Sequence, residues 1–159
     1  MARSTRRLAA ALLLTGATAL GVGACSPITT MNSYAPSDGV RGDLGNQLRV
    51  ENLMILSPAE GAEGNVLGAL VNETTSPVDV TLTIDGVSGG QQLNVPAQDT
   101  LLLGPEYEAV TIPTVPVPPG AVTAVQVSTP ESGSITLDVP VLDGTLPPYE
   151  EYVPAAPEE

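Results

Sequence analysis

Residues able to perform acid–base, nucleophilic or metal chemistry are scarce in this chain. Its 159 residues include no histidine and one cysteine, and its five Lys or Arg residues are all arginine. Ser-His-Asp, Cys-His and Ser-Lys catalysis are therefore excluded, as are zinc sites built from His or Cys. Paired carboxylates remain, because two suitably spaced acids can hydrolyse glycosides. The pairs are Glu60 with Glu63, in a predicted turn, and Glu106 with Glu108, which would share a strand face.

We interpret these carboxylates as solvated surface groups. The chain has eighteen Asp and Glu residues, so acidic neighbours are common in it. A sugar cleft normally offers an aromatic platform, and Tyr107 is the sole aromatic residue between positions 47 and 143. Asp38-Gly39 with Asp43 lacks the closely alternating oxygen ligands of a calcium loop. The sequence predicts no enzymatic activity, no catalytic residue, no metal site and no cofactor.

The cysteine lies at the end of an export signal. Arginines near the start precede an apolar run over residues 8–20, which small residues at 22–24 and Cys25 follow. A charged start, an apolar core of about 7–15 residues and small residues at the cleavage site are typical of a secretory signal peptide. The run is too short and too rich in Ala and Gly for a membrane-spanning helix, which needs about 20 apolar residues.

Val22-Gly23-Ala24-Cys25 resembles the lipobox of bacterial lipoproteins. The resemblance implies cleavage between Ala24 and Cys25, a thioether-linked diacylglycerol on Cys25, and acylation of its amine. Two or three acyl chains hold a protein stably on a membrane, whereas one chain binds only marginally. We therefore expect residues 1–24 to be removed and the rest to be anchored to the outer face of the cytoplasmic membrane.

The chain beyond the signal is strongly acidic. Arg41 and Arg49 stand against all eighteen acids, a net of −16. Such a surface repels phosphate backbones, so nucleic-acid binding is excluded. Anionic lipid headgroups repel it as well, so the acyl chains on Cys25 must provide the membrane attachment. No internal disulfide is expected, because the chain has no second cysteine.

Residues 47–143 show the alternation of β-strands. Apolar residues alternate with polar ones over 78–84 and again over 135–141, where Pro140 suggests an edge or a bulge. Leu48 and Val50 are out of phase with Leu53 and Ile55, which predicts a bulge near Glu51-Asn52. The expected strands cover 48–55, 65–72, 78–84, 91–95, 100–103, 109–112, 122–128 and 135–141.

These short strands predict an all-β fold, an immunoglobulin-like or cupredoxin-like β-sandwich of seven to eight strands, whose strand order the sequence leaves open. The proline-rich run 112–119 could present a polyproline ligand, but we favour an extended connection between strands. Residues 25–46 are expected to form a flexible arm, because Ser, Thr, Gly, Pro and Asp occur there without a period. Residues 144–159 are expected to form an acidic, proline-rich disordered tail.

The tail has two interpretations. It could be a solubilising end, which we favour, or a partner-binding peptide around Pro147, Pro148, Tyr149 and Tyr152. In the second interpretation the partner would be an envelope protein.

The layout resembles small actinobacterial cell-envelope lipoproteins of largely unknown role. The segments that carry the resemblance are Ser33-Tyr34-Ala35-Pro36-Ser37-Asp38-Gly39, Leu48-Arg49-Val50-Glu51-Asn52-Leu53, Leu67-Gly68-Ala69-Leu70-Val71-Asn72, Val95-Pro96-Ala97 and Leu137-Asp138-Val139-Pro140-Val141. It is also similar, more distantly, to periplasmic copper chaperones of the PCu(A)C type, which bind Cu(I) through His and Met. This chain has no His, and Met31 and Met54 are its only methionines after Cys25. Copper binding needs several soft ligands together, so the resemblance implies a related scaffold without the copper site.

Together these observations predict a lipid-anchored, non-enzymatic, extracytoplasmic β-sandwich that serves as a binding or accessory module of the cell envelope. The alternative is a metal or solute chaperone. Asn72-Glu73-Thr74 also matches a glycosylation sequon, a match we regard as accidental in a bacterial lipoprotein.

Overall fold

The computed structural model describes residues 37–155. In this range the chain forms nine strands and one short 3-10 helix. The strands are β1 (Val40–Leu44), β2 (Leu48–Leu56), β3 (Gly64–Asn72), β4 (Val78–Ile84), β5 (Gln91–Val95), β6 (Asp99–Leu103), β7 (Thr111–Ile112), β8 (Val122–Thr129) and β9 (Gly133–Leu142), and the 3-10 helix is η2 (Glu150–Tyr152). The predicted all-β fold is confirmed, and each of the eight expected strands is present.

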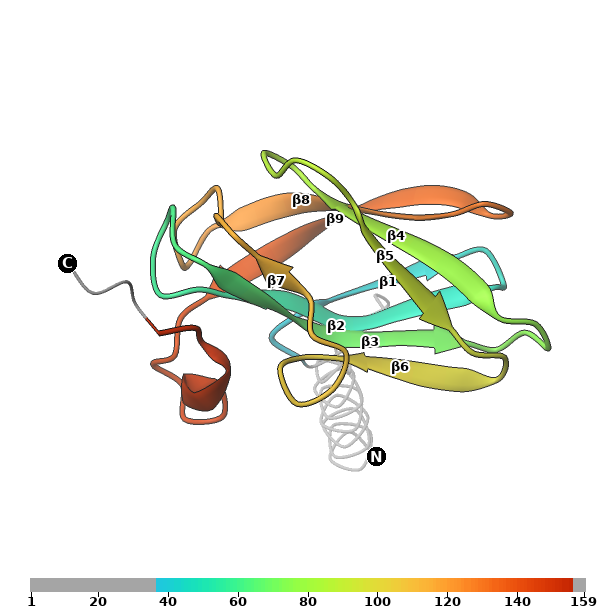
Figure 1. The fold of residues 1–159 in the computed structure, drawn as a ribbon, viewed down its shortest axis with the longest axis horizontal. Helices are drawn as coiled ribbons and strands as arrows, with labels where there is room; N and C mark the ends of the chain where they lie inside the picture. The colour runs from blue at the N-terminus through green and yellow to red at the C-terminus, as the bar shows by residue number, and fades with distance from the viewer. Residues whose placement is uncertain (1–36, 156–159) are drawn as a thin grey trace, which may run out of the picture. The chain divides into compact units, whose positions relative to one another are not determined.

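The strands form two layers that share one continuous path, β5-β4-β8-β9-β2-β3-β6. β1 pairs with β2 on one layer, and β7 pairs with β3. In Figure 1, β8 and β9 run along one side of the domain, and β2, β3 and β6 run along the other. β9 joins the layers through a short parallel pairing of Val141 and Leu142 with the end of β2. The result is a nearly closed β-sandwich.

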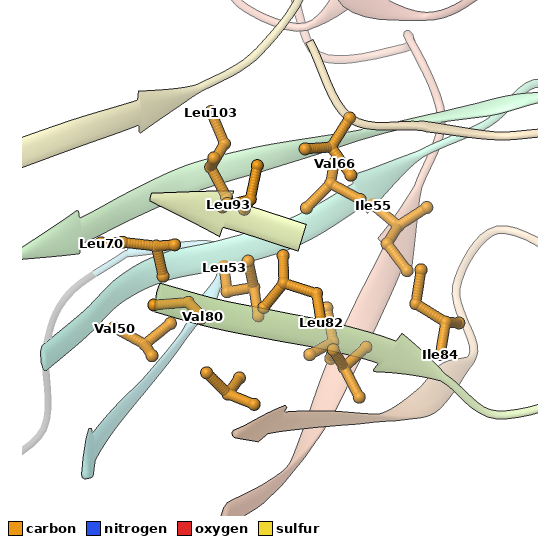
Figure 2. Close-up of a cluster of buried hydrophobic side chains, with 14 of the residues drawn as sticks. Val50, Leu53, Ile55, Val66, Leu70, Val80, Leu82, Ile84, Leu93 and Leu103 are labelled. Carbon is orange, nitrogen blue, oxygen red and sulfur yellow. The ribbon is translucent and has the colours of Figure 1, made fainter. Parts of the chain in front are cut away.

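An aliphatic core fills the space between the layers (Figure 2). On β4 the apolar residues Val78, Val80, Leu82 and Ile84 are buried, while the residues between them are half-buried or exposed. Leucine, valine and isoleucine make up the core cluster entirely. The sequence contains no Phe or Trp, so branched aliphatic side chains fill the core, and these pack well on pleated sheets.

A bulge in β2 resolves its two apolar phases, as predicted. The β2–β3 register shifts between Glu51 and Met54, and Asn52 has a φ of 52°. Asn52 tolerates this left-handed conformation better than most residues, and its Oδ1 accepts a hydrogen bond from the Gly39 N–H at 2.9 Å. The shift directs Leu53 and Ile55 into the same core as Val50.

Pro140 produces no bulge, but its nitrogen lies on a locally unpaired side of β9, which agrees with the expected edge. β9 lies between β8 and β2, and Pro140 pairs with Val122 in an uninterrupted β8–β9 register. The Val141 N–H donates to Ala121 O at 2.9 Å, so the adjacent Pro140 nitrogen faces the other side of the strand. There β2 pairs only with Val141 and Leu142, and the missing N–H breaks no ladder bond.

Both flanks of the sandwich also differ from the expectation. The predicted arm 25–46 contains β1, so the sheet begins at Val40 and not at residue 47. The predicted disordered tail 144–159 contains η2, which lies away from β8 and β9 in Figure 1. Pairing with β2 orders β1, and contacts with the sheet order the part of the tail that the structure describes.

Candidate functional site

Three tyrosines line one small hollow on the outer face of the β2–β3–β6 layer. They are Tyr107, Tyr149 and Tyr152, the only aromatic residues in the described part of the chain. The hollow has a volume of about 160 Å³, and its other lining residues are Asn52, Met54, Leu67, Gly68, Leu103 and Gly104. This convergence of residues distant in sequence makes the hollow, here called the tyrosine pocket, the candidate functional site.

The alternation of β2 and β3 builds the floor of the tyrosine pocket. Met54 pairs with Leu67, and both lie on the outer face, because their neighbours Ile55 and Val66 point into the core. Met54 is nevertheless only 1% exposed. Met54 lines the hollow together with Tyr149 and Tyr152, so the tail docks beside an apolar part of the outer face.

Hydrogen bonds hold the tail over this floor. The Asn65 Nδ2 amide donates to Tyr152 O at 2.8 Å, and the Tyr152 N–H donates to Tyr149 O at 3.0 Å. The Tyr149 hydroxyl donates to Asp38 Oδ2 at 2.6 Å, and the Tyr152 hydroxyl lies 3.4 Å from Glu106 Oε2. The tail therefore contacts β3, the residues before β1, and the loop after β6.

Two carboxylates outside the lining, Asp38 and Glu106, lie beside the hydroxyls of Tyr149 and Tyr152, and they are here called the acidic rim of the tyrosine pocket. The hydrogen bond to Asp38 raises the pKa of Tyr149 to about 12, since it favours the protonated phenol. The charge of Glu106 raises the pKa of Tyr152 as well, with a smaller contribution from Glu151. In both cases an acidic neighbour favours the protonated phenol, through a hydrogen bond at Tyr149 and through charge at Tyr152.

Arg41 and Arg49, the two arginines within residues 37–155, lie on β1 and β2 and contact acids there. Arg49 Nε lies 2.7 Å from Glu51 Oε1, a charge contact without hydrogen-bond alignment, and Arg49 Nη1 donates to Glu73 Oε1 at 2.8 Å. Arg41 lies within 3.6 Å of Asp43 and Glu51. An open polar hollow of about 480 Å³ beside Arg49 includes Asp43 and Glu73 in its lining. The cations there are already paired with acids of the same chain.

The carboxylate pairs considered for catalysis are not arranged as an active site. Glu106 and Glu108 lie in the loop after β6 and not on a strand, which corrects the expectation of a shared strand face. The Glu108 N–H donates to Leu102 O at 3.1 Å, so this residue serves to close the loop. Glu60 and Glu63 are exposed. Among residues 37–155, no group of three His, Cys, Asp or Glu residues is placed to hold a metal ion.

The remaining sequence motifs have structural roles or lie outside the described residues. Val115, in the proline-rich run, is buried and exchanges hydrogen bonds of 2.9 Å with Gly61 and Ala62, as expected of a connection between strands. Asn72 is 1% exposed, so its amide is inaccessible to glycosylation. Ala24, Cys25, Met31 and Tyr34 lie outside the described residues.

The structure separates the four tail residues proposed for partner binding. Pro147 and Pro148 are exposed, whereas Tyr149 and Tyr152 are half-buried in the tyrosine pocket. Sequence reasoning missed Tyr107 and Met54 as their neighbours. The available signal was compositional, because tyrosine is the only aromatic residue type in the chain.

Comparison with known proteins finds similarity in structure alone. No family model and no curated protein matches the chain. The solved structure "Copper-bound PCuAC domain from PmoF2" matches with a TM-score of 0.52 and 15% identity, covering 65% of this chain and 98% of that one. "Apo PCuAC domain from PmoF1" matches with a TM-score of 0.51 and 17% identity, over 64% and 98%. "apo PmoF2 PCuAC domain" matches with a TM-score of 0.53 and 15% identity, over 67% and 98%.

At these identities the likeness shows the fold and nothing finer. The chain has the β-sandwich of the cupredoxin-like PCuAC domains.

Proposed function

We propose that this chain is a lipid-anchored, non-enzymatic β-sandwich that acts outside the cytoplasm as a binding or accessory module of the cell envelope. The observation that carries the proposal is the tyrosine pocket. Its rings and acidic rim offer a surface for recognition, and its lining contains no histidine, lysine or cysteine. The partner would be an envelope protein that contacts the docked tail.

The membrane attachment rests on the N-terminal sequence. The resemblance of Val22-Gly23-Ala24-Cys25 to a lipobox supports acyl chains on Cys25, and the resemblance to actinobacterial envelope lipoproteins supports the same location. None of the helices within residues 37–155 has the length and apolar character to cross a membrane. Mass spectrometry of the mature N-terminus tests this part, since a terminus other than acylated Cys25 would refute it.

In-cell crosslinking of the tagged protein, followed by identification of what co-purifies from membranes, tests the accessory role. Recurrent recovery of one envelope complex is expected, and deletion of residues 146–159 should abolish it. Deletion of residues 156–159 alone is the matched control, since it removes terminal acids and leaves the docked tyrosines. Equal recovery with both deletions would show that the tail is not the contact, and no partner in any sample would contradict the accessory role.

A copper chaperone is the second candidate, because one structural neighbour is a copper-bound domain. The residues available as copper ligands do not support this candidate. The sequence has no histidine, and Met54 is only 1% exposed. We therefore propose a related scaffold that does not bind Cu(I), which prefers clustered soft ligands. Competition against a colorimetric Cu(I) chelator should leave all copper with the chelator, and transfer to the protein would revive the chaperone hypothesis. A melting shift on calcium addition would support solute handling instead.

A further inference from the structure

The tyrosine pocket is lined by electron-rich rings, and the hydroxyls of two of them contact carboxylates that lie outside the lining. Its lining holds Tyr107, Tyr149 and Tyr152, and neither Arg41 nor Arg49 is among the lining residues. Cations are attracted to the faces of tyrosine rings, more strongly where water is partly excluded. We propose that the pocket receives the guanidinium group of an arginine side chain from a partner protein. This deepens the binding role proposed above and rests on it.

The carboxylates on the rim distinguish an arginine from other cations. Asp38 and Glu106 each use one oxygen toward a tyrosine hydroxyl and keep a second oxygen. A guanidinium stacks on a ring and donates several in-plane hydrogen bonds at once, so it can use rings and carboxylates together. A quaternary ammonium has no N–H to donate. A lysine ammonium donates but does not stack as a planar group.

The size and exposure of the pocket suit the end of a side chain. Cavities of about 150 Å³ accommodate a guest the size of benzene, and the tyrosine pocket has a volume of about 160 Å³. Tyr107 is 61% exposed, so the pocket is open on the side of this ring. An open site of this kind can receive a group presented from another protein surface.

The surface beside the pocket supports a protein as the source of the arginine. Cross-strand partners share a face of a sheet, so the pairings Met54 with Leu67 and Ala69 with Leu102 place these four residues on one outer face. Leu102 is 43% exposed. An apolar strip therefore continues from the pocket floor to the edge strand β6, where a protein partner would bury it around the anchored arginine.

The test measures binding of a minimal arginine probe to the full chain, purified from its host in a nonionic detergent. The probe is acetyl-Gly-Arg-Gly-amide, and the matched neutral probe replaces Arg with citrulline, which has nearly the same shape. Tyrosine fluorescence follows binding, because the chain contains no Trp. Amide NMR shifts at Gly68 and Gly104 locate it. The arginine peptide is expected to bind with a Kd of about 1 mM, and the citrulline peptide about tenfold more weakly.

Variants separate ring, charge and folding effects. Tyr107→Leu should weaken arginine-peptide binding about three- to tenfold, whereas Tyr107→Phe, which keeps the ring, should stay within about twofold. Glu106→Gln should weaken binding about threefold, whereas Asp85→Asn, an equal charge change after β4 on the other layer, should leave it nearly unchanged. Tyr107 is exposed, so its variants are expected to fold.

Several outcomes would overturn the assignment. Equal binding of both peptides, or no binding of either, would exclude a guanidinium site. Tighter binding of tetramethylammonium than of the arginine peptide would assign the pocket to small organic cations instead. Partner recovery in the crosslinking experiment without arginine-peptide binding would refute this inference and leave the accessory role standing.

Discussion

The Tyr149 hydroxyl donates a 2.6 Å hydrogen bond to Asp38 Oδ2, which joins the C-terminal tail to the residues just before β1. The two residues are 111 positions apart, so this bond links opposite ends of the described chain. Tyr152 is held nearby through its backbone carbonyl by Asn65. The tail is therefore a docked part of the sandwich, and its tyrosines are available to shape a binding surface.

Replacing Tyr149 with phenylalanine should loosen the docked tail and leave the sandwich intact. The variant keeps the ring and loses the hydrogen bond to Asp38, which should lower the local stability by about 1 kcal/mol. Faster hydrogen exchange at the Tyr152 amide, which donates to Tyr149 O, measures the effect. Tyr152→Phe is the control, because it removes only the 3.4 Å contact with Glu106. An equal effect of both variants would contradict a special role for the Tyr149 bond.

The stability of the docked tail should depend on alkaline pH. The Asp38 hydrogen bond raises the pKa of Tyr149 from 10.0 to about 12. A group whose pKa is raised by folding contributes stability below its unfolded pKa, and this contribution disappears as the pH rises through the folded value. Docking should therefore weaken between pH 10 and about pH 12. Phenolate absorbance should show a step near pH 12 that Tyr149→Phe removes, and absence of that step would refute the bond.

Local alternation predicts most of the sandwich from the sequence, whereas long-range contacts define the rest. β4 and β9 follow from apolar residues at every second position, and the bulge at Asn52 follows from a change of phase in β2. β1 has no such signal, because its five residues include a glycine and two charges. It becomes a strand through its pairing with β2.

The tyrosine pocket was only partly predictable for the same reason. Tyr149 and Tyr152 drew attention as aromatic residues in a proline-rich tail, but composition alone favoured disorder. The tail is ordered by contacts with the outer face of the sheet, where Met54 is buried and the Asn65 amide donates a hydrogen bond to Tyr152 O. Neither contact can be inferred from the tail itself.

The buried amide of Asn72 should be among the more sensitive polar positions of the fold. Its Nδ2 donates to the carbonyls of Ser76, Val95 and Pro96, and its Oδ1 accepts from the N–H and hydroxyl of Thr74. Asn72→Ala leaves several of these groups without a partner, so the free energy of unfolding should fall by about 2–3 kcal/mol. Urea denaturation measures the loss.

The control for this position is Asn94→Ala. Asn94 is exposed, and its amide makes one 2.7 Å hydrogen bond to Asp79 Oδ1. Its loss should lower the free energy of unfolding by less than about 1 kcal/mol. Similar losses at the two positions would show that burial of the Asn72 amide does not decide its contribution.

Gly68 should tolerate no side chain, because it lies against the β2 bulge at the floor of the tyrosine pocket. Its φ is +145°, and an added Cβ would lie 3.0 Å from both Glu51 O and Leu53 Cα. These are backbone atoms that cannot rotate away, so Gly68→Ala should destabilise the fold by about 2–4 kcal/mol and distort the pocket. Gly61→Ala is the matched control, since Gly61 has a φ of +80° with nothing within 4 Å of its Cβ position. Because this variant has backbone strain but no steric clash, its free energy of unfolding should fall by only about 1–2 kcal/mol. Urea denaturation measures both losses. A smaller loss for Gly68→Ala than for Gly61→Ala would refute the view that close packing at the bulge requires glycine at position 68.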